Sequence, residues 1–228
     1  MTVIIGAMCS DGIVMIADRK ITDITGNTLR YENKIFGDME HILIGYGGGF
    51  GTFDIFRKYI VGDITLLRDD KNNRYTFDNF IPKVNQSVHR FNNFVKHSYF
   101  EIIVGKHRGN LSELYYIKKN GEAISTDYIT IGSGKATADI FLKNVKNNNT
   151  DMRTFAKNAC LSIAYMNRYR PDDRVGFELN GFPTIKYLNF IKNMDEEVST
   201  QEIEEFRIFI KEKFNEHDNH LKNLINSL

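Results

Sequence analysis

The sequence predicts an α+β fold of four layers, in which two β-sheets lie face to face between two layers of helices, with a further helix at the C-terminus. Short apolar runs joined by tight turns indicate antiparallel strands that are buried on both faces, so each sheet needs a layer on either side. Strand patterns alternate with two pairs of helical patterns, which is the order that an αββα sandwich requires. The 228 residues suffice for one such domain.

The first half of the chain contains strand patterns followed by two helical patterns. Four strands are expected before residue 50, at residues 3–9, 13–17, 31–36 and 41–46. Asp11-Gly12 between the first two strands is a strong signal for a tight hairpin turn. A glycine-rich run at residues 45–51 leads into the first helix, which is expected through Phe53, Phe56 and Ile60. Apolar residues at helical spacing predict a long amphipathic helix over residues 76–97.

The second half repeats this order. Strands are expected at residues 100–104, 114–117, 128–131, 175–179 and 184–188, and helices at residues 138–145 and 150–166. Asn180-Gly181 is expected to be the turn of a closing hairpin between the last two strands.

The C-terminal tail differs from the rest in its pattern. Apolar residues recur there every three or four positions, at Ile203, Phe206, Ile210, Phe214, Leu221, Leu224 and Leu228. This spacing predicts one apolar stripe on a helix of about thirty residues, and such a stripe must be covered. We therefore expect a single domain over residues 1–192, with residues 193–228 forming an amphipathic helix that packs on the domain or on a partner.

Composition argues against several kinds of partner. The net charge of +1 gives no electrostatic case for binding nucleic acid or an anionic membrane. No run approaches the roughly 18 apolar residues of a membrane span, and a cytoplasmic location is expected. Cys9 and Cys160 lie in apolar runs and are expected to be buried thiols. His217 and His220 could bind a metal, but an exposed helix face is favoured, so neither a metal nor a cofactor is expected.

Thr2 is the leading candidate for a nucleophile. Removal of Met1, expected before so small a residue, would leave a free α-amine beside the Thr2 hydroxyl. An α-amine with a reference pKa of about 7.7–8.0 is suited to accept the proton of that hydroxyl near pH 7. Lys34 near the nucleophile would favour the neutral amine and the developing alkoxide, and Asp18 would hold the lysine charged and oriented.

These residues carry a family resemblance. Thr2, Gly6, the run Ala17-Asp18-Arg19-Lys20 and Lys34-Ile35-Phe36 together resemble the N-terminal region of proteasome β-type subunits and their bacterial relatives. These proteins are N-terminal nucleophile (Ntn) hydrolases. The resemblance implies an αββα sandwich that assembles into homo-oligomeric rings or stacked rings, acts on peptide or protein substrates, and has a possible ATPase partner.

The resemblance also implies roles for further residues. The N–H of Gly48 would stabilise the oxyanion, and Ser133, within Gly132-Ser133-Gly134, would hydrogen-bond the α-amine of Thr2. Four residues would lie near the pocket for the residue before the scissile bond, namely Ile21, Glu32, Tyr46 and Phe50. Glu32 suggests a preference for basic residues there, and Tyr46 suggests a shallow pocket.

The chain departs from the family pattern after its second pair of helices. Many active proteasome subunits have an aspartate and then a serine there, whereas this chain has Arg168 and Pro171 at about those positions. Asp172 and Asp173 are close enough in sequence for one of them to take the place of the missing aspartate. The chain is therefore expected to be a divergent relative.

The function that the sequence favours is threonine-type hydrolysis of peptide bonds through an acyl-enzyme. Two alternatives remain open. The same acyl-enzyme could transfer its acyl group to an amine, which would make the protein a peptide ligase or transpeptidase. The chain could also be a structural subunit that keeps the fold without catalysis.

Overall fold

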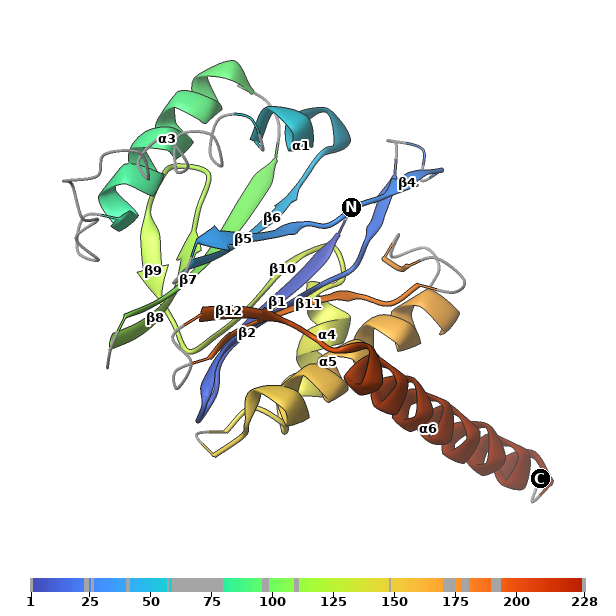
Figure 1. The fold of residues 1–228 in the computed structure, drawn as a ribbon. Helices are drawn as coiled ribbons and strands as arrows, with labels where there is room; N and C mark the ends of the chain where they lie inside the picture. The colour runs from blue at the N-terminus through green and yellow to red at the C-terminus, as the bar shows by residue number, and fades with distance from the viewer. Residues whose placement is uncertain are drawn as a thin grey trace.

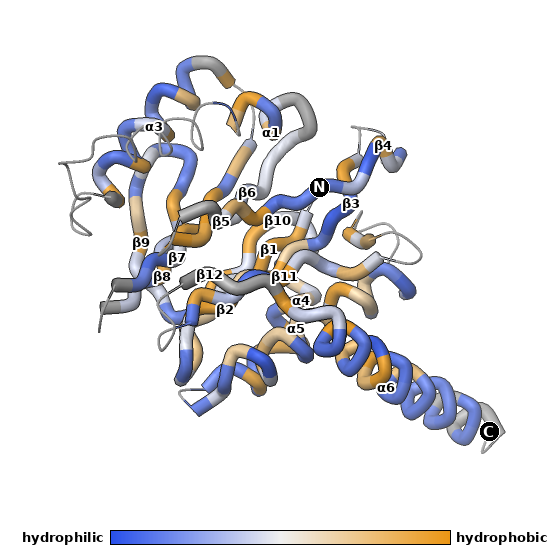
Figure 2. The backbone as a smooth tube through the Cα atoms, in the orientation of Figure 1, coloured by the Kyte–Doolittle hydropathy of each residue, from blue (hydrophilic) through white to orange (hydrophobic). Residues whose placement is uncertain are grey.

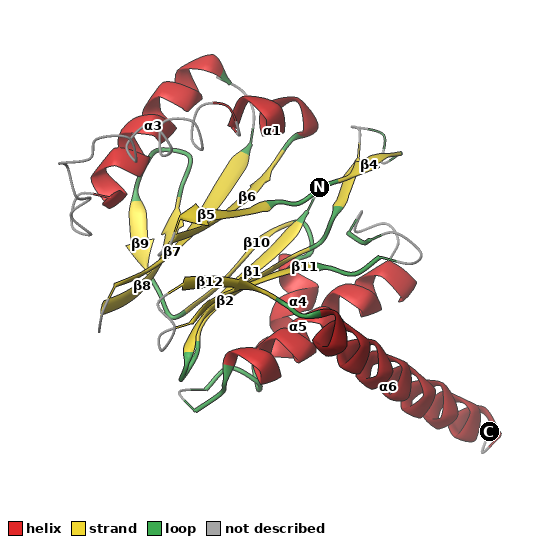
Figure 3. Ribbon diagram, in the orientation of Figure 1, coloured by secondary structure: helices red, strands yellow, loops and turns green. Residues whose placement is uncertain are grey.

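A computed structural model of the chain describes residues 2–22, 25, 27–39, 42–56, 58, 80–95, 99–108, 111–147, 149–169, 175–177, 181–189 and 194–226. Within these residues, two five-stranded sheets lie face to face, and a pair of helices covers the outer face of each sheet (Figure 1). Figure 3 shows this succession of helix, sheet, sheet and helix layers directly. The αββα sandwich that the sequence predicted is confirmed.

The first sheet has the strand order β10-β1-β2-β11-β12, and all of its neighbouring strands are antiparallel. Its strands are β1 (Val3–Met8), β2 (Gly12–Ala17), β10 (Tyr128–Gly132), β11 (Thr184–Asn189) and β12 (Met194–Glu197). In β1, Val3 and Ile5 pack against the helix layer, whereas Ile4 packs against the other sheet. A strand that is covered on both faces needs apolar residues at successive positions, which explains the uninterrupted apolar run.

The second sheet has the order β5-β6-β7-β8-β9, again with antiparallel neighbours. Its strands are β5 (Ile35–Met39), β6 (Ile42–Gly48), β7 (Phe100–Arg108), β8 (Leu111–Ile117) and β9 (Ala123–Ser125). Two short strands, β3 (Lys20–Thr22) and β4 (Thr28–Tyr31), form a separate two-stranded ribbon.

Helices cover the outer face of each sheet. Over the second sheet lie α1 (Phe50–Phe56) and α3 (Phe80–Phe94), and over the first lie α4 (Lys135–Leu142) and α5 (Met152–Tyr169). The side chains of Phe56 and Phe91 are buried against the second sheet. Those of Phe155 and Ile163 are buried against the first. Figure 2 shows hydrophobic residues concentrated in the strands between the two helical layers.

The C-terminal helix α6 (Thr200–Asn226) continues from β12 and packs on α5 through contacts that reach as far as Asp218. Phe206 and Ile210 are buried in its first half, and the Tyr187 hydroxyl donates a hydrogen bond to Glu202 (2.7 Å). The C-terminal end of α6 extends away from the sandwich (Figure 1). Division of the chain at residue 192 into a domain and an appended helix stays a prediction, although residues 194–197 form β12 in the first sheet.

Two sequence expectations were wrong in detail. Residues 31–36 do not form one strand, because β4 ends at Tyr31 and β5 begins at Ile35. Residues 175–177 are not a strand either, and residues 178–179 lie outside the described part of the chain. The closing hairpin is formed by β11 and β12 instead. The physical reason is that Gly176 accepts the N–H groups of Arg19 and Lys20 through its carbonyl, so its segment lies beside β3.

Among the described helices, none combines the length and apolar character that crossing a bilayer requires. The described residues also contain no group of three or more His, Cys, Asp or Glu side chains that could hold a metal ion.

Candidate active site

Thr2 lies immediately before β1, at the end of the sandwich where the first and second sheets come together, and its side chain is buried. Its carbonyl oxygen accepts two hydrogen bonds, from the N–H of Gly134 and from the hydroxyl of Ser133, both at 3.4 Å. Gly132 precedes these residues with a φ of +88°. A Cβ atom at Gly132 would lie 2.1 Å from the Thr2 carbonyl oxygen, so only glycine fits against Thr2 here.

Asp18 is a fully buried carboxylate directly after β2 that binds the Thr2 side chain. The Thr2 hydroxyl donates to Asp18 Oδ1 at 2.6 Å. The same oxygen accepts the N–H of Val3 at 2.8 Å. The second carboxylate oxygen accepts the N–H groups of Lys20 (3.1 Å) and Gly176 (3.4 Å). With both oxygens hydrogen-bonded, the carboxylate is held in one orientation beside the hydroxyl.

Lys34 completes this group from the short segment between β4 and β5. Its Nζ lies 2.8 Å from Asp18 Oδ1 and donates to the carbonyl oxygen of Lys20 at 2.7 Å. Burial lowers the pKa of Lys34 below its ordinary value, and the neighbouring Asp18 carboxylate opposes that shift. A continuous strand was expected over residues 31–36. Lys34 lies instead in the connection between β4 and β5, and its side chain enters the site from there.

A small pocket lies next to Thr2. Its lining residues come from the N-terminus, the β3 strand, the β4–β5 connection and the β6–α1 junction, and they are Thr2, Lys20, Ile21, Thr22, Lys34, Tyr46, Gly48, Gly49 and Phe53. The cavity volume is about 10 Å³, which is room for about one water molecule. Tyr46 occupies much of the space: its ring is buried and stacks on Phe56, and its hydroxyl hydrogen-bonds Thr52.

Gly48 lies at the end of β6 and lines this pocket together with Thr2. A Cβ atom at Gly48 would lie 2.4 Å from the Tyr46 hydroxyl, so a side chain at this position would displace Tyr46. The absence of a side chain lets the backbone of residue 48 border the pocket directly. This is the position at which the resemblance implies an oxyanion donor, and that role stays a prediction.

Of the four residues expected near the substrate pocket, only some line the pocket beside Thr2. Ile21 and Tyr46 line the pocket. Glu32 does not line it, and its carboxylate lies 2.7 Å from Nε of Arg30, which also contacts Asp54. The side chain of Phe50 lies outside the described part of the structure. The expected place of Glu32 near the substrate therefore stays a prediction, and its carboxylate pairs with an arginine on the β4 strand.

The structure brings Ser133 to Thr2, but the described contact is with the Thr2 carbonyl oxygen. Its expected bond to the α-amine stays a prediction. Arg168, at the place of the family's aspartate, forms an ion pair with Asp218 of α6 at 2.8 Å and lies over the rings of Tyr169 and Phe214. Its guanidinium therefore contributes to helix packing. Pro171, Asp172 and Asp173 lie outside the described residues.

Sequence reasoning missed several residues that the structure brings to the site, among them Phe53, Gly176 and Glu101. Phe53 lines the pocket one turn into α1, and Gly176 donates its N–H to Asp18. Glu101 accepts the N–H of Gly132 at 3.1 Å from a strand of the other sheet. The signal for Glu101 was an acidic residue at the start of an apolar strand, whereas the contact of Gly176 depends on the chain path and has no local signal.

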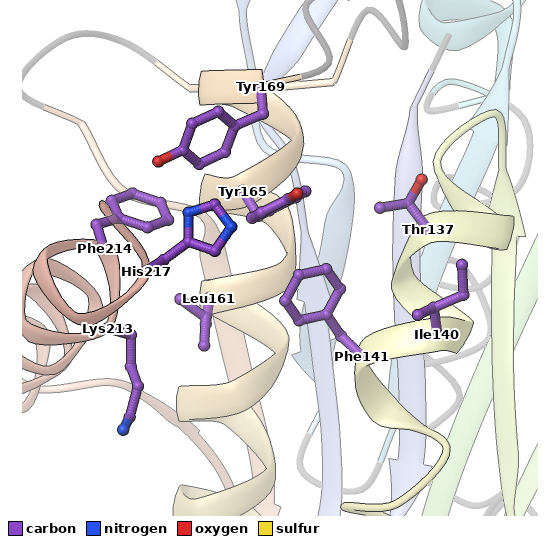
Figure 4. A pocket seen from close by; sticks show the side chains of 9 residues that line it. All are labelled: Thr137, Ile140, Phe141, Leu161, Tyr165, Tyr169, Lys213, Phe214 and His217. Atoms are coloured by element: carbon purple, nitrogen blue, oxygen red, sulfur yellow. The ribbon is translucent and has the colours of Figure 1, made fainter. Parts of the chain in front are cut away.

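A larger pocket lies elsewhere, between α4, α5 and α6 (Figure 4). Its volume is about 710 Å³, and the rings of Tyr165, Tyr169, Phe214 and His217 gather at the junction of α5 and α6. These contacts hold α6 against α5. We locate the candidate active site at Thr2, because the buried hydroxyl, carboxylate and ammonium groups are joined there.

Three comparisons relate the chain to known proteins. A family model described as "Proteasome subunit" matches residues 2–172. The proteasome subunit beta of Methanobrevibacter smithii (strain ATCC 35061 / DSM 861 / OCM 144 / PS) is 25% identical over 139 residues, which are 60% of this chain and 65% of that protein. The match thus spans just under two thirds of that relative.

Two solved structures share the fold. Anbu (ancestral beta-subunit) from Yersinia bercovieri superposes with a TM-score of 0.73 at 15% identity, over 99% of this chain and 97% of that one. The Anbu (Gly-1) mutant from Hyphomicrobium sp. strain MC1 gives the same TM-score and identity over 100% and 98% of the two chains.

Proposed function

The chain belongs to the proteasome subunit family, and from this premise we propose that it is an N-terminal threonine hydrolase that cleaves peptide bonds through an acyl-enzyme. One observation carries the proposal. The buried hydroxyl of Thr2 lies 2.6 Å from Asp18 Oδ1, and the Lys34 ammonium lies 2.8 Å from the same oxygen. A nucleophile beside a charged, preoriented pair is the arrangement that acyl transfer requires.

The reaction begins with removal of Met1, which frees the α-amine of Thr2. That amine takes the proton from Thr2 Oγ1 as the oxygen attacks the substrate carbonyl. The positive charge of Lys34 stabilises the developing alkoxide, and the N–H of Gly48 donates to the oxyanion, where one such donor is typically worth about 3 kcal/mol. The α-ammonium then returns its proton to the leaving amine, which departs and leaves an ester on Thr2.

The second half of the reaction regenerates the enzyme. Water attacks the ester carbonyl and transfers a proton to the α-amine, and the acid product leaves as Thr2 Oγ1 recovers its proton. Ser133 orders the α-amine in both halves, which is supported by the contact between its hydroxyl and the Thr2 carbonyl (3.4 Å). Asp18 keeps Lys34 charged against the desolvation that lowers its pKa.

The pocket beside Thr2 indicates the substrate preference. Ile21, Tyr46 and Phe53 line it together with polar residues that include Thr2, Thr22 and Lys34, and its volume of about 10 Å³ leaves little room for a long side chain. We therefore infer that the residue before the scissile bond is small. Glu32 does not support a preference for basic residues, because its carboxylate is engaged by Arg30.

We also propose that the chain acts in the cytoplasm as a homo-oligomeric ring or stacked ring, with an ATPase partner for folded substrates. Family membership supports the assembly. The projecting C-terminal end of α6 is a candidate contact between subunits. Light scattering on the purified protein tests the assembly, since a monomer at micromolar concentration would contradict it.

The catalytic proposal is tested with Thr2→Ala and Thr2→Ser variants on a panel of peptides that differ at the residue before the scissile bond. Thr2→Ala should abolish cleavage, and Thr2→Ser should retain part of it because the hydroxyl and amine remain. Thr25→Ala, which changes an exposed threonine, should cleave like the wild type. Cleavage that survives in Thr2→Ala would refute the mechanism.

The same assay distinguishes the two alternatives from hydrolysis. With an acceptor amine present, mass spectrometry of the products detects ligation, because the acyl group then appears joined to the acceptor instead of to water. A wild-type protein that neither hydrolyses nor ligates any peptide in the panel would favour a structural subunit.

A further inference from the structure

Glu101 is a half-buried acidic residue whose side chain connects the two sheets at the candidate active site. It lies in β7, in the second sheet, one residue from the start of the strand. Its Oε2 accepts the N–H of Gly132, the last residue of β10 in the first sheet, at 3.1 Å. Because β10 is an edge strand of the first sheet, Glu101 provides an acceptor for the last N–H of that edge.

The two residues that follow Gly132 in the sequence hydrogen-bond the main chain of Thr2. Gly132 pairs with Val3 in the β1–β10 ladder, and its φ of +88° turns the chain toward Ser133. Ser133 and Gly134 then both donate to the Thr2 carbonyl oxygen. The position of this turn therefore sets the position of Thr2.

The backbone of Glu101 also lies beside a strand that reaches the site. In the β6–β7 ladder, Glu101 lies opposite Gly47, which is adjacent to Gly48. A Cβ atom at Gly47 would lie only 3.1 Å from Cγ2 of Thr2. Glu101 thus joins the strand that carries the expected oxyanion donor to the turn that holds the nucleophile.

The Glu101 carboxylate is itself held in place. Tyr116, on the neighbouring strand β8, donates its hydroxyl to Glu101 Oε1 at 2.6 Å. Tyr99 also hydrogen-bonds Glu101, and burial together with this carboxylate raises the pKa of Tyr99 to about 12. With Oε1 bound by the Tyr116 hydroxyl, Oε2 is held toward the N–H of Gly132.

We propose that Glu101 is a positioning residue for Thr2, acting through the Gly132 N–H and the turn Gly132-Ser133-Gly134. Its importance for the rate rests on the proposed hydrolase function, whereas its effect on the turn does not. A misplacement of reacting groups by about 1 Å can cost about 100-fold in rate, so a loosened turn should lower kcat without weakening substrate binding.

The test compares Glu101→Ala with Glu101→Gln in the full-length protein. Glutamine keeps an acceptor oxygen for Gly132, whereas alanine removes it. The matched control is Glu122→Gln, which changes an exposed glutamate that pairs with Lys118 in the connection between β8 and β9 of the same sheet. The rate of amide hydrogen exchange over residues 128–134 measures how stably the turn is held. Peptide cleavage assays give kcat and KM separately.

In Glu101→Ala, exchange over residues 128–134 should be about 10-fold faster and kcat about 10-fold or more lower, with KM within about 2-fold of the wild type. Glu101→Gln and Glu122→Gln should resemble the wild type in both measurements. Unchanged exchange in Glu101→Ala would overturn the proposal, and so would faster exchange with unchanged kcat. If the wild type proves inert, the proposed function fails, and hydrogen exchange alone decides whether Glu101 holds the turn.

Discussion

At the scale of single residues, the proposed chemistry depends on a charge that is shielded from water. Asp18 has no exposed surface, yet its Oδ1 accepts hydrogen bonds from Thr2, Val3 and Lys34. Two of these donors, Thr2 and Lys34, are side chains that act in the proposed mechanism. The third is the backbone N–H of Val3 at the start of β1. Because several donors share one oxygen, a change in any of them is expected to affect the others.

Lys34→Met should reduce stability, because it leaves the Asp18 carboxylate buried without its cation. Loss of one partner of a buried ion pair costs about 3–5 kcal/mol. We expect the lower end of that range, since the N–H groups of Val3 and Lys20 still stabilise the carboxylate. Chemical denaturation measures the loss.

The control is the double variant Asp18→Asn with Lys34→Met, which removes both charges. It should be less destabilised than the sum of the two single variants, because no unpaired charge remains. Additive losses would contradict the view that the two charges interact directly.

Gly132→Ala should disrupt the site, because a Cβ atom there would lie 2.1 Å from the backbone oxygen of Thr2. Gly121→Ala is the matched control, since Gly121 also has a positive φ (+83°) but its Cβ would contact only the His89 side chain. The control should lose about 1–2 kcal/mol from backbone strain alone and keep peptide cleavage. Gly132→Ala should lose more stability and all cleavage, and equal behaviour of the two variants would count against the close contact with Thr2.

At the scale of elements, α6 has one face that belongs to the core and one that does not. Phe206 is almost fully buried, whereas Ile208, two residues further on, is 59% exposed. Phe206 packs within the cluster that also contains Phe182 and Phe155. The segment of α6 that carries Phe206 is therefore part of the fold.

Phe206→Ala should cost about 3–5 kcal/mol of unfolding free energy, because it leaves a cavity beneath α6. Ile208→Ala should change it by less than about 0.5 kcal/mol. Thermal or denaturant unfolding of the two variants distinguishes them. Similar losses in both would mean that the outer face of α6 is covered in the protein as it exists in solution.

At the scale of the whole molecule, alkaline pH should weaken the fold through buried tyrosines. Burial is the largest cause that raises the pKa of Tyr187 and of Tyr128 above the ordinary value of 10.0. The folded state therefore keeps a proton that the unfolded state loses above pH 10. The stability from each tyrosine is complete below pH 10 and falls by about 1.4 kcal/mol per pH unit above it.

Lys34 has the opposite sign, since its lowered pKa favours folding as pH rises toward 10.5. The informative quantity is therefore the difference between the wild type and Tyr187→Phe, measured by urea denaturation at pH 8, 10 and 11. The advantage of the wild type should shrink by about 1 kcal/mol between pH 10 and pH 11. A constant difference would show that the Tyr187 hydroxyl is not shielded from solvent in the folded state.

The layered fold could be predicted because burial on both faces leaves a direct signal in the sequence. Apolar residues at successive positions in β1 and β2 indicate a sheet that is covered on both sides. The end of β4 at Tyr31 has no signal in the local sequence, and the residues after it include Lys34, which reaches Asp18 across the site. Local propensity contains no information about such long-range contacts.

In the candidate site, too, some features could be predicted from the sequence and others could not. Proximity of Thr2, Asp18 and Lys34 was predicted, and the structure joins them by hydrogen bonds. Their catalytic roles stay predictions. The ion pair between Glu32 and Arg30 was not predicted, because spacing along the sequence does not reveal it. Glu101 was missed because it contacts Gly132, which lies 31 positions away in the sequence and in the other sheet.

The central claim, that Thr2 is an N-terminal nucleophile, is tested most directly by treating the wild-type protein with an electrophilic peptide probe and locating the adduct by peptide mass spectrometry. The account predicts that Met1 is absent and that the adduct lies on Thr2, within the fragment of residues 2–19, and that Thr2→Ala forms none. A wild-type protein that retains Met1, or that carries the adduct on another residue, would contradict the account.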